Sequence, residues 1–180
     1  MLKRLLIAAA IFGLAPLSMT ASAWAHGPSR QKVVETIEIN APADKVWAAI
    51  GNFQDASWIP VVAKTEGKGG NEKGATRTLT LQNGGTVEEQ LDTYDAEGKS
   101  YSYEITKVDV KVLPVNDYSS RITVSSEGDK TTVEWKGAFY RGYMLNDPPP
   151  ELSDEVAFKA VKDLYTSTLE ALKKKIEGGS

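Results

Sequence analysis

The chain has 180 residues, a formal net charge of −3, 41% hydrophobic residues, one histidine and no cysteine. This length suits one domain that builds its core from packing alone, because no disulfide is available. An acidic chain without a substantial basic cluster is a poor candidate for nucleic-acid binding.

Residues 1–25 have the pattern of a secretory signal peptide. Lys3 and Arg4 form a basic start, residues 5–19 are apolar, and small residues offer cleavage after Ala23 or, as we prefer, Ala25. The apolar run is shorter than the ~20 residues of a membrane-spanning helix and contains a proline. We therefore expect a cleaved leader with no membrane span afterwards. Export would lead to the periplasm of a Gram-negative cell, or out of a cell with a single membrane.

Cleavage would leave a mature chain that begins at His26. Loss of Lys3 and Arg4 changes the formal charge from −3 to −5, and we expect residues 26–31 to be flexible. His26 is the only histidine, and no cysteine accompanies it, so we expect neither a metal site nor a cofactor. The same shortage argues against histidine-based acid–base or triad catalysis in the domain.

The domain itself begins with a strand followed by a short helix. Residues 32–40 are rich in β-formers, and Pro42 then stands where a helix tolerates its missing N–H. Residues 54–60 predict either a turn or a second short helix. The apolar residues that share one face of the first helix are Val46, Trp47, Ile50 and Phe53.

A series of strands separated by turn residues occupies the middle of the chain. Asn83-Gly84-Gly85 is a strong hairpin signal, and residues 114–117 break the pattern. Because the connections are short, the consecutive strands should form an antiparallel meander. The predicted strands cover residues 62–67, 75–82, 86–94, 99–108, 118–126 and 131–142.

One long amphipathic helix ends the chain. Ser153 offers an N-cap, and about twenty helical residues follow with one wide apolar face. The residues assigned to this face are Ala157, Phe158, Val161, Leu164, Tyr165, Leu169, Leu172 and Ile176. We therefore predict an α+β fold, in which a curved antiparallel sheet of about seven strands wraps around the long helix. One or two short helices should close one end.

This order of elements, together with several short motifs, resembles the START/Bet v 1-like (SRPBCC) superfamily. The superfamily includes polyketide cyclases, dehydrases and lipid-transport proteins with a helix-grip fold. The likeness covers residues 32–177, and the leader with Tyr-Ser-Tyr-Glu-Ile looks most like MxaD-like periplasmic accessory proteins of methanol oxidation. The motifs lie at residues 37–47, 58–60, 74–77, 84–89, 101–105, 118 and 133–135.

The resemblance implies a cavity between sheet and helix. The candidate cavity residues are Trp58, Arg77, Glu89, Tyr103, Glu104, Trp135 and Phe139. Trp58 is either a core residue or a cavity wall that touches ligand. Arg77 and Glu89 are either an ordinary ion pair on the outer face or a polar pair inside the cavity.

Two functions follow from the resemblance. The first is a non-enzymatic accessory or carrier protein, expected to be a monomer that holds a small apolar molecule or assists a periplasmic quinoprotein dehydrogenase and its cytochrome. The second is a cyclase-like enzyme in which Arg77, Glu89 or Glu104 positions an enolisable carbonyl. Convergent desolvated polar groups in the cavity would favour the enzyme, whereas a dry apolar lumen would favour binding.

Overall fold

The computed structural model describes residues 27–178, so the predicted signal peptide and His26 lie outside the described residues. Seven strands form one antiparallel sheet in the order β1-β7-β6-β5-β4-β3-β2. The elements in chain order are β1 (Gln31–Ile39), α1 (Ala43–Ile50), β2 (Val62–Lys68), β3 (Thr76–Leu81), β4 (Thr86–Asp95), β5 (Ser100–Val108), β6 (Val115–Glu127), β7 (Lys130–Arg141), the 3-10 turn η1 (Pro150–Leu152) and α2 (Asp154–Gly178).

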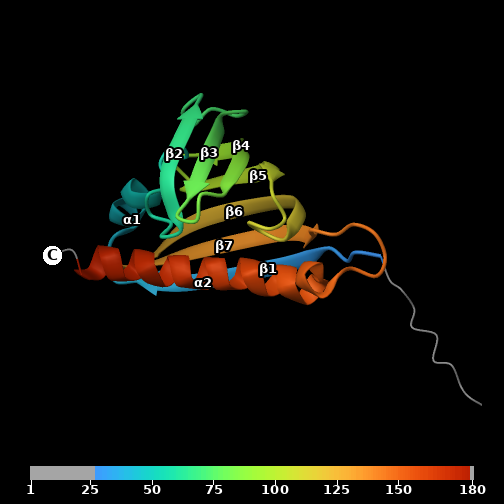
Figure 1. Ribbon diagram of the computed structural model, residues 1–180. Helices are drawn as coiled ribbons and strands as arrows, with labels where there is room; N and C mark the ends of the chain where they lie inside the picture. Colours follow the sequence, from blue (N-terminus) through green and yellow to red (C-terminus); the bar gives the residue numbers. More distant parts are fainter. Residues whose placement is uncertain (1–26, 179–180) are drawn as a thin grey trace, which may run out of the picture.

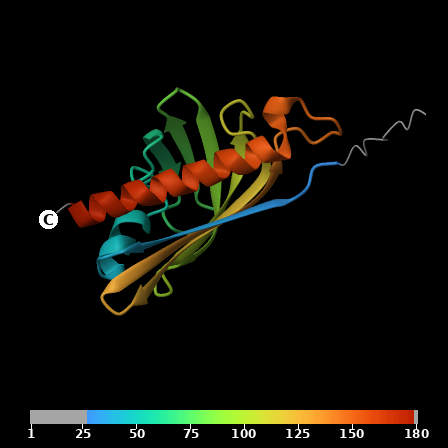
Figure 2. The same ribbon diagram turned by 90° about the horizontal axis from the view of Figure 1, so that it is seen from below.

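The predicted helix-grip architecture is confirmed. Strands β2 to β7 form the expected meander, and β1 pairs with β7 at the far edge of the sheet. Helix α2 lies along β1 and β7, while β2, β3 and β4 rise away from it on the other side (Figure 1). Figure 2 shows the same helix crossing the open side of the curved sheet. Within residues 27–178, no helix is both long and apolar enough to cross a membrane.

Helix α1 closes one end of the sheet, and its apolar residues, including Trp47, pack against the strands there. The Trp47 ring packs 5.8 Å from Tyr94 and 6.0 Å from Tyr101, measured between ring centroids. Gly51 ends the helix by donating its N–H to the Trp47 carbonyl, and a Cβ there would lie 2.5 Å from the Trp47 ring. The chain then continues through turns, so the alternative of a second short helix at residues 54–60 is not realised.

Helix α2 begins where the sequence predicts and buries most of the assigned face. The backbone N–H of Val156 donates to Ser153 Oγ at 3.3 Å, which is the expected N-cap contact. The prediction for Phe158 was wrong, because this side chain is 38% exposed. It follows Ala157 by about 100° around the helix, and Ala157, with Val161 and Tyr165, occupies the contact face.

Two further features set the ends of the last strands. β6 begins at Val115, earlier than predicted, and absorbs the expected break as an irregularity between Asn116 and Ser119, with Asp117 at φ 47°. At the end of β7, buried Arg141 ties the following loop to α2. Its Nη1 bonds Asp154 Oδ2 at 2.8 Å, and its Nη2 donates to the Leu145 carbonyl at 2.8 Å.

Candidate functional site

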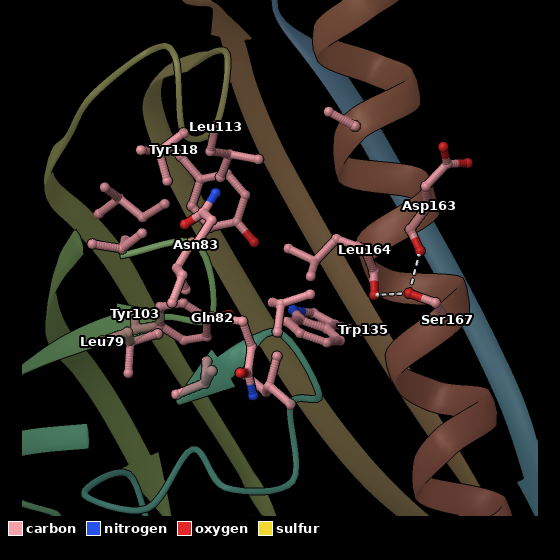
Figure 3. Close-up of a pocket in the computed structure, with 18 residues that line it drawn as sticks. Leu79, Gln82, Asn83, Tyr103, Leu113, Tyr118, Trp135, Asp163, Leu164 and Ser167 are labelled. Carbon is pink, nitrogen blue, oxygen red and sulfur yellow. Dashed lines mark hydrogen bonds between the residues drawn. The ribbon is translucent and has the colours of Figure 1, made fainter. Parts of the chain in front are cut away.

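An apolar cavity lies where α2 parts from the sheet. Because α2 packs on β1 and β7, it leaves a space of about 530 Å³ toward the β3–β4 hairpin. Leu164 enters from the helix, while Leu79 and Tyr103 lie on the opposite wall (Figure 3). The lining residues are Ile59, Val61, Val62, Leu79, Leu81, Gln82, Asn83, Val87, Tyr103, Ile105, Val112, Leu113, Tyr118, Trp135, Ala160, Asp163, Leu164 and Ser167.

The cavity wall is mostly apolar, with polar groups at two places. Gln82 and Asn83 come from the β3–β4 turn, and Asp163 and Ser167 from exposed positions of α2. Tyrosine and tryptophan side chains supply the other polar atoms. Asp163 is the only carboxylate among the described lining residues, and it is exposed and ion-paired with Lys159. No lysine, arginine or histidine belongs to this described lining set.

An aromatic cluster joins β7 to α2 beside the cavity. The Trp135 ring of β7 stacks on Tyr165 of α2, with centroids 4.1 Å apart and planes 12° from parallel. Trp58 packs against the same indole at 5.3 Å. Trp135 also lines the cavity, so the wall at this point is held from both sides and should change little on ligand entry.

A chain of hydroxyl groups lies within this cluster. The hydroxyls of Tyr118 and Tyr165 are hydrogen-bonded, and Tyr165 Oη lies 3.1 Å from Ser120 Oγ. Ser120 Oγ also donates to the Lys136 carbonyl at 2.8 Å and accepts the Trp135 indole N–H at 2.7 Å. Tyr118 lines the cavity, and Figure 3 shows its hydroxyl directed toward the interior of the pocket.

These tyrosines are neutral under ordinary conditions. Burial raises the pKa of Tyr118 and of Tyr165 well above the usual value near 10. Burial likewise raises the pKa of Tyr103, the other cavity tyrosine, well above that value. The cavity therefore offers neutral hydroxyls rather than phenolate bases at neutral pH.

Arg77 and Glu89 form a buried ion pair on the inner side of the sheet, rather than the outer pair that was the other expectation. The two residues face each other in the β3–β4 register, and Arg77 Nε donates to Glu89 Oε2 at 2.6 Å. Arg77 Nη1 donates to the Phe53 carbonyl at 2.8 Å, and the guanidinium lies 4.2 Å from the Phe53 ring centroid and 5.2 Å from that of Tyr103. Neither charged residue belongs to the cavity lining.

Burial and charge act against each other within this pair. Burial acts to lower the pKa of Arg77, but the Glu89 carboxylate, together with Tyr101 and Tyr103, outweighs it, so the net pKa lies above its usual value. Burial raises the pKa of the Glu89 carboxyl, and the Arg77 charge offsets part of that rise. The pair is therefore held mainly by mutual contact, which makes it a structural link between β3, β4 and the turn at Phe53.

The remaining predicted site residues divide between core and surface. Trp58 and Phe139 are buried in the core without lining the cavity; Phe139 stacks on Tyr118 at 6.1 Å. Glu104 does not reach the cavity, because it is exposed on the face opposite its neighbour Tyr103. Of the seven candidates, Tyr103 and Trp135 line the space.

Sequence reasoning missed the hydroxyl chain. Tyr118 and Tyr165 were assigned to a strand and to the apolar helix face, with no role for their hydroxyls. A buried tyrosine needs a partner for its O–H, and this rule is the signal that would have raised the question. It would not have identified the partner, since the two residues are 47 positions apart.

A curved sheet that packs around a long helix and leaves an apolar cavity between them is the arrangement of a helix-grip protein. The sequence matches the family described as polyketide cyclase / dehydrase and lipid transport over residues 30–177, and the chain belongs to that family. No curated protein matches it significantly.

Several solved structures are similar to this chain. An uncharacterised protein from Bacillus thuringiensis shares 27% identity at a TM-score of 0.69, covering 81% of this chain and 98% of its own. The protein XoxI from Bacillus cereus shares 28% identity at a TM-score of 0.67, with coverages of 81% and 94%. Norcoclaurine synthase from Thalictrum flavum, at 15% identity and a TM-score of 0.63 over 96% and 99% of the two chains, shows the fold alone.

Proposed function

We propose that this protein is exported and binds a small apolar molecule in the cavity between α2 and the β3–β4 hairpin. The observation that carries the proposal is the apolar space of about 530 Å³, within the size range of small-molecule sites. Burial of apolar ligand surface would supply the binding free energy, at roughly 25 cal/mol per Å² before the costs of association.

The polar groups support binding rather than chemistry. The cyclase hypothesis requires Arg77, Glu89 or Glu104 to lie next to the reacting carbonyl, where a charged group could act as an acid, a base or an electrostatic stabiliser. Arg77 and Glu89 are bonded to each other outside the lining, and Glu104 is on the surface. The enzyme hypothesis therefore gains no specific support from this arrangement.

The test is binding of a neutral apolar fluorophore, N-phenyl-1-naphthylamine, followed by emission. Ala160 lines the cavity from α2, so Ala160→Trp should place an indole inside it and strongly weaken saturable binding. Glu170→Trp adds the same side chain at an exposed position of that helix and should leave binding unchanged. Equal binding by both variants would place the fluorophore elsewhere and contradict the proposal.

The resemblance to MxaD-like proteins extends this proposal to a partner. In its ligand-bound form, the protein would assist a periplasmic quinoprotein dehydrogenase and its cytochrome during methanol or alcohol oxidation. The test is to add the purified mature protein to a periplasmic extract that lacks it and to follow alcohol-dependent cytochrome reduction. Stimulation by the wild type is expected; an unchanged rate would leave a carrier without this accessory role.

A further inference from the structure

The directions of the hydrogen bonds beside the cavity restrict the ligand further. Ser120 has one hydroxyl proton, and the nearest acceptor is the Lys136 carbonyl at 2.8 Å, which can only accept. Ser120 Oγ therefore accepts from its other two neighbours, the Trp135 indole and the Tyr165 hydroxyl. Once Tyr165 has donated its proton to Ser120, it can only accept from Tyr118.

This sequence of bonds leaves the Tyr118 oxygen as an acceptor. Its single proton points to Tyr165, while the hydroxyl itself is directed into the cavity (Figure 3). A ligand atom that meets this oxygen must therefore bring a proton. A carbonyl or ether oxygen would face a lone pair and gain no hydrogen bond from it.

Tyr103 supplies the complementary group. It also lines the cavity, with its ring centroid 6.4 Å from that of Tyr118. Its neutral hydroxyl can donate to a ligand oxygen. A ligand hydroxyl has a proton for Tyr118 and a lone pair for a donor such as Tyr103, whereas a ketone or ether has no proton to give Tyr118.

Charge excludes a further class of ligand. The described lining residues include no cation, so a carboxylate entering the apolar part would lose its hydration without a counter-charge. An ammonium group would meet no carboxylate near Tyr118, since Asp163 is exposed and paired with Lys159. The ligand should therefore be uncharged.

We propose, resting on the proposed binding function, that the cavity selects neutral alcohols or phenols, whose hydroxyl donates to Tyr118, over ketones, ethers and carboxylates of the same shape.

Four probes with one naphthalene body test this selection by calorimetric titration at pH 7. They are 2-naphthol, 2-methoxynaphthalene, 2-acetonaphthone and 2-naphthoate. The wild type should bind 2-naphthol about ten-fold more tightly than the ether or the ketone, as expected for one hydrogen bond, and 2-naphthoate most weakly. Equal affinity for the three neutral probes would overturn the selection and leave the binding function standing. Binding of none of them would contradict both.

Three conservative variants locate the effect. Tyr118→Phe should remove the preference for 2-naphthol by weakening its binding alone. Tyr165→Phe frees the Tyr118 proton to point into the cavity, so the affinity for 2-acetonaphthone should rise toward that for 2-naphthol. Tyr101→Phe removes a buried hydroxyl that does not line the cavity and should keep the wild-type preference. A ten-fold preference that survives in Tyr118→Phe would overturn the assignment.

Discussion

Replacement of Arg77 by methionine should destabilise the protein strongly. The change leaves the Glu89 carboxylate buried without its donor and leaves the Phe53 carbonyl without the 2.8 Å bond from Nη1. Removing one partner of a buried ion pair costs about 3–5 kcal/mol. Glu89→Gln should approach the same range, because the Arg77 charge then stays buried beside a neutral amide.

The double variant separates the pair from its surroundings. Arg77→Met together with Glu89→Gln buries no unpaired charge, so its cost should fall below the sum of the two single changes by more than 1 kcal/mol, about the most that an exposed ion pair contributes. Urea unfolding of the wild type and three variants measures this coupling. The exposed pair Lys107–Glu88, with atoms 3.0 Å apart, is the matched control and should couple by about 0–1 kcal/mol.

The same set of Arg77 and Glu89 variants also tests whether the ion pair is structural or part of the binding site. Because neither residue lines the cavity, variants that remain folded should bind N-phenyl-1-naphthylamine as the wild type does. Coupling no larger than that of Lys107–Glu88 would refute the argument from burial. Strong coupling together with selective loss of binding in folded variants would refute the assignment of a purely structural role.

Three other predictions concern the helix, alkaline pH and the leader. In urea melts, Leu169→Ala should cost about 2–5 kcal/mol, because this side chain is fully packed. Leu164 is half-buried beside the cavity, so Leu164→Ala should cost less, and Lys162→Ala should change stability by no more than about 0.5 kcal/mol. Equal losses in the three variants would contradict the described docking of α2. Burial raises the pKa of the Tyr101 hydroxyl to about 12, so the folded protein holds this proton more tightly than the unfolded chain does. The resulting stabilisation is complete below pH 10, and about 2–3 kcal/mol of it should be lost in urea melts as the pH rises to 12. A free energy of unfolding that stays constant over that range would contradict this prediction. Intact mass of the exported protein should correspond to a chain starting at His26, whereas a full-length membrane-bound product would contradict the predicted localisation.

Much of the fold could be predicted because its signals are local. Alternation in residues 75–82 and 86–94, with Asn83-Gly84-Gly85 between them, fixes a hairpin that places Arg77 opposite Glu89. Alternation also places Glu104 on the face opposite Tyr103, so the two residues cannot both line the cavity. The prediction for Phe158 was wrong because a step of one residue turns a helical side chain by about 100°, which moves it from the edge of the apolar face toward solvent.

The site depends on contacts that no local pattern contains. Arg77 donates to the Phe53 carbonyl, 24 residues away, and alternation within β3 does not predict this contact. The hydrogen bond between the Tyr118 and Tyr165 hydroxyls depends on where α2 packs along the sheet, because that position brings Tyr165 next to Tyr118. The volume left beside Leu164 is likewise a product of how the helix is placed, which periodicity alone does not specify.

Native mass spectrometry of the protein, purified from its own cells without denaturation, tests the central claim most directly. We predict that the wild type and Glu170→Trp carry a small uncharged molecule that dissociates on unfolding, and that Ala160→Trp carries much less of it. An empty wild type, or an adduct retained equally by Ala160→Trp, would contradict the claim that this cavity is the binding site.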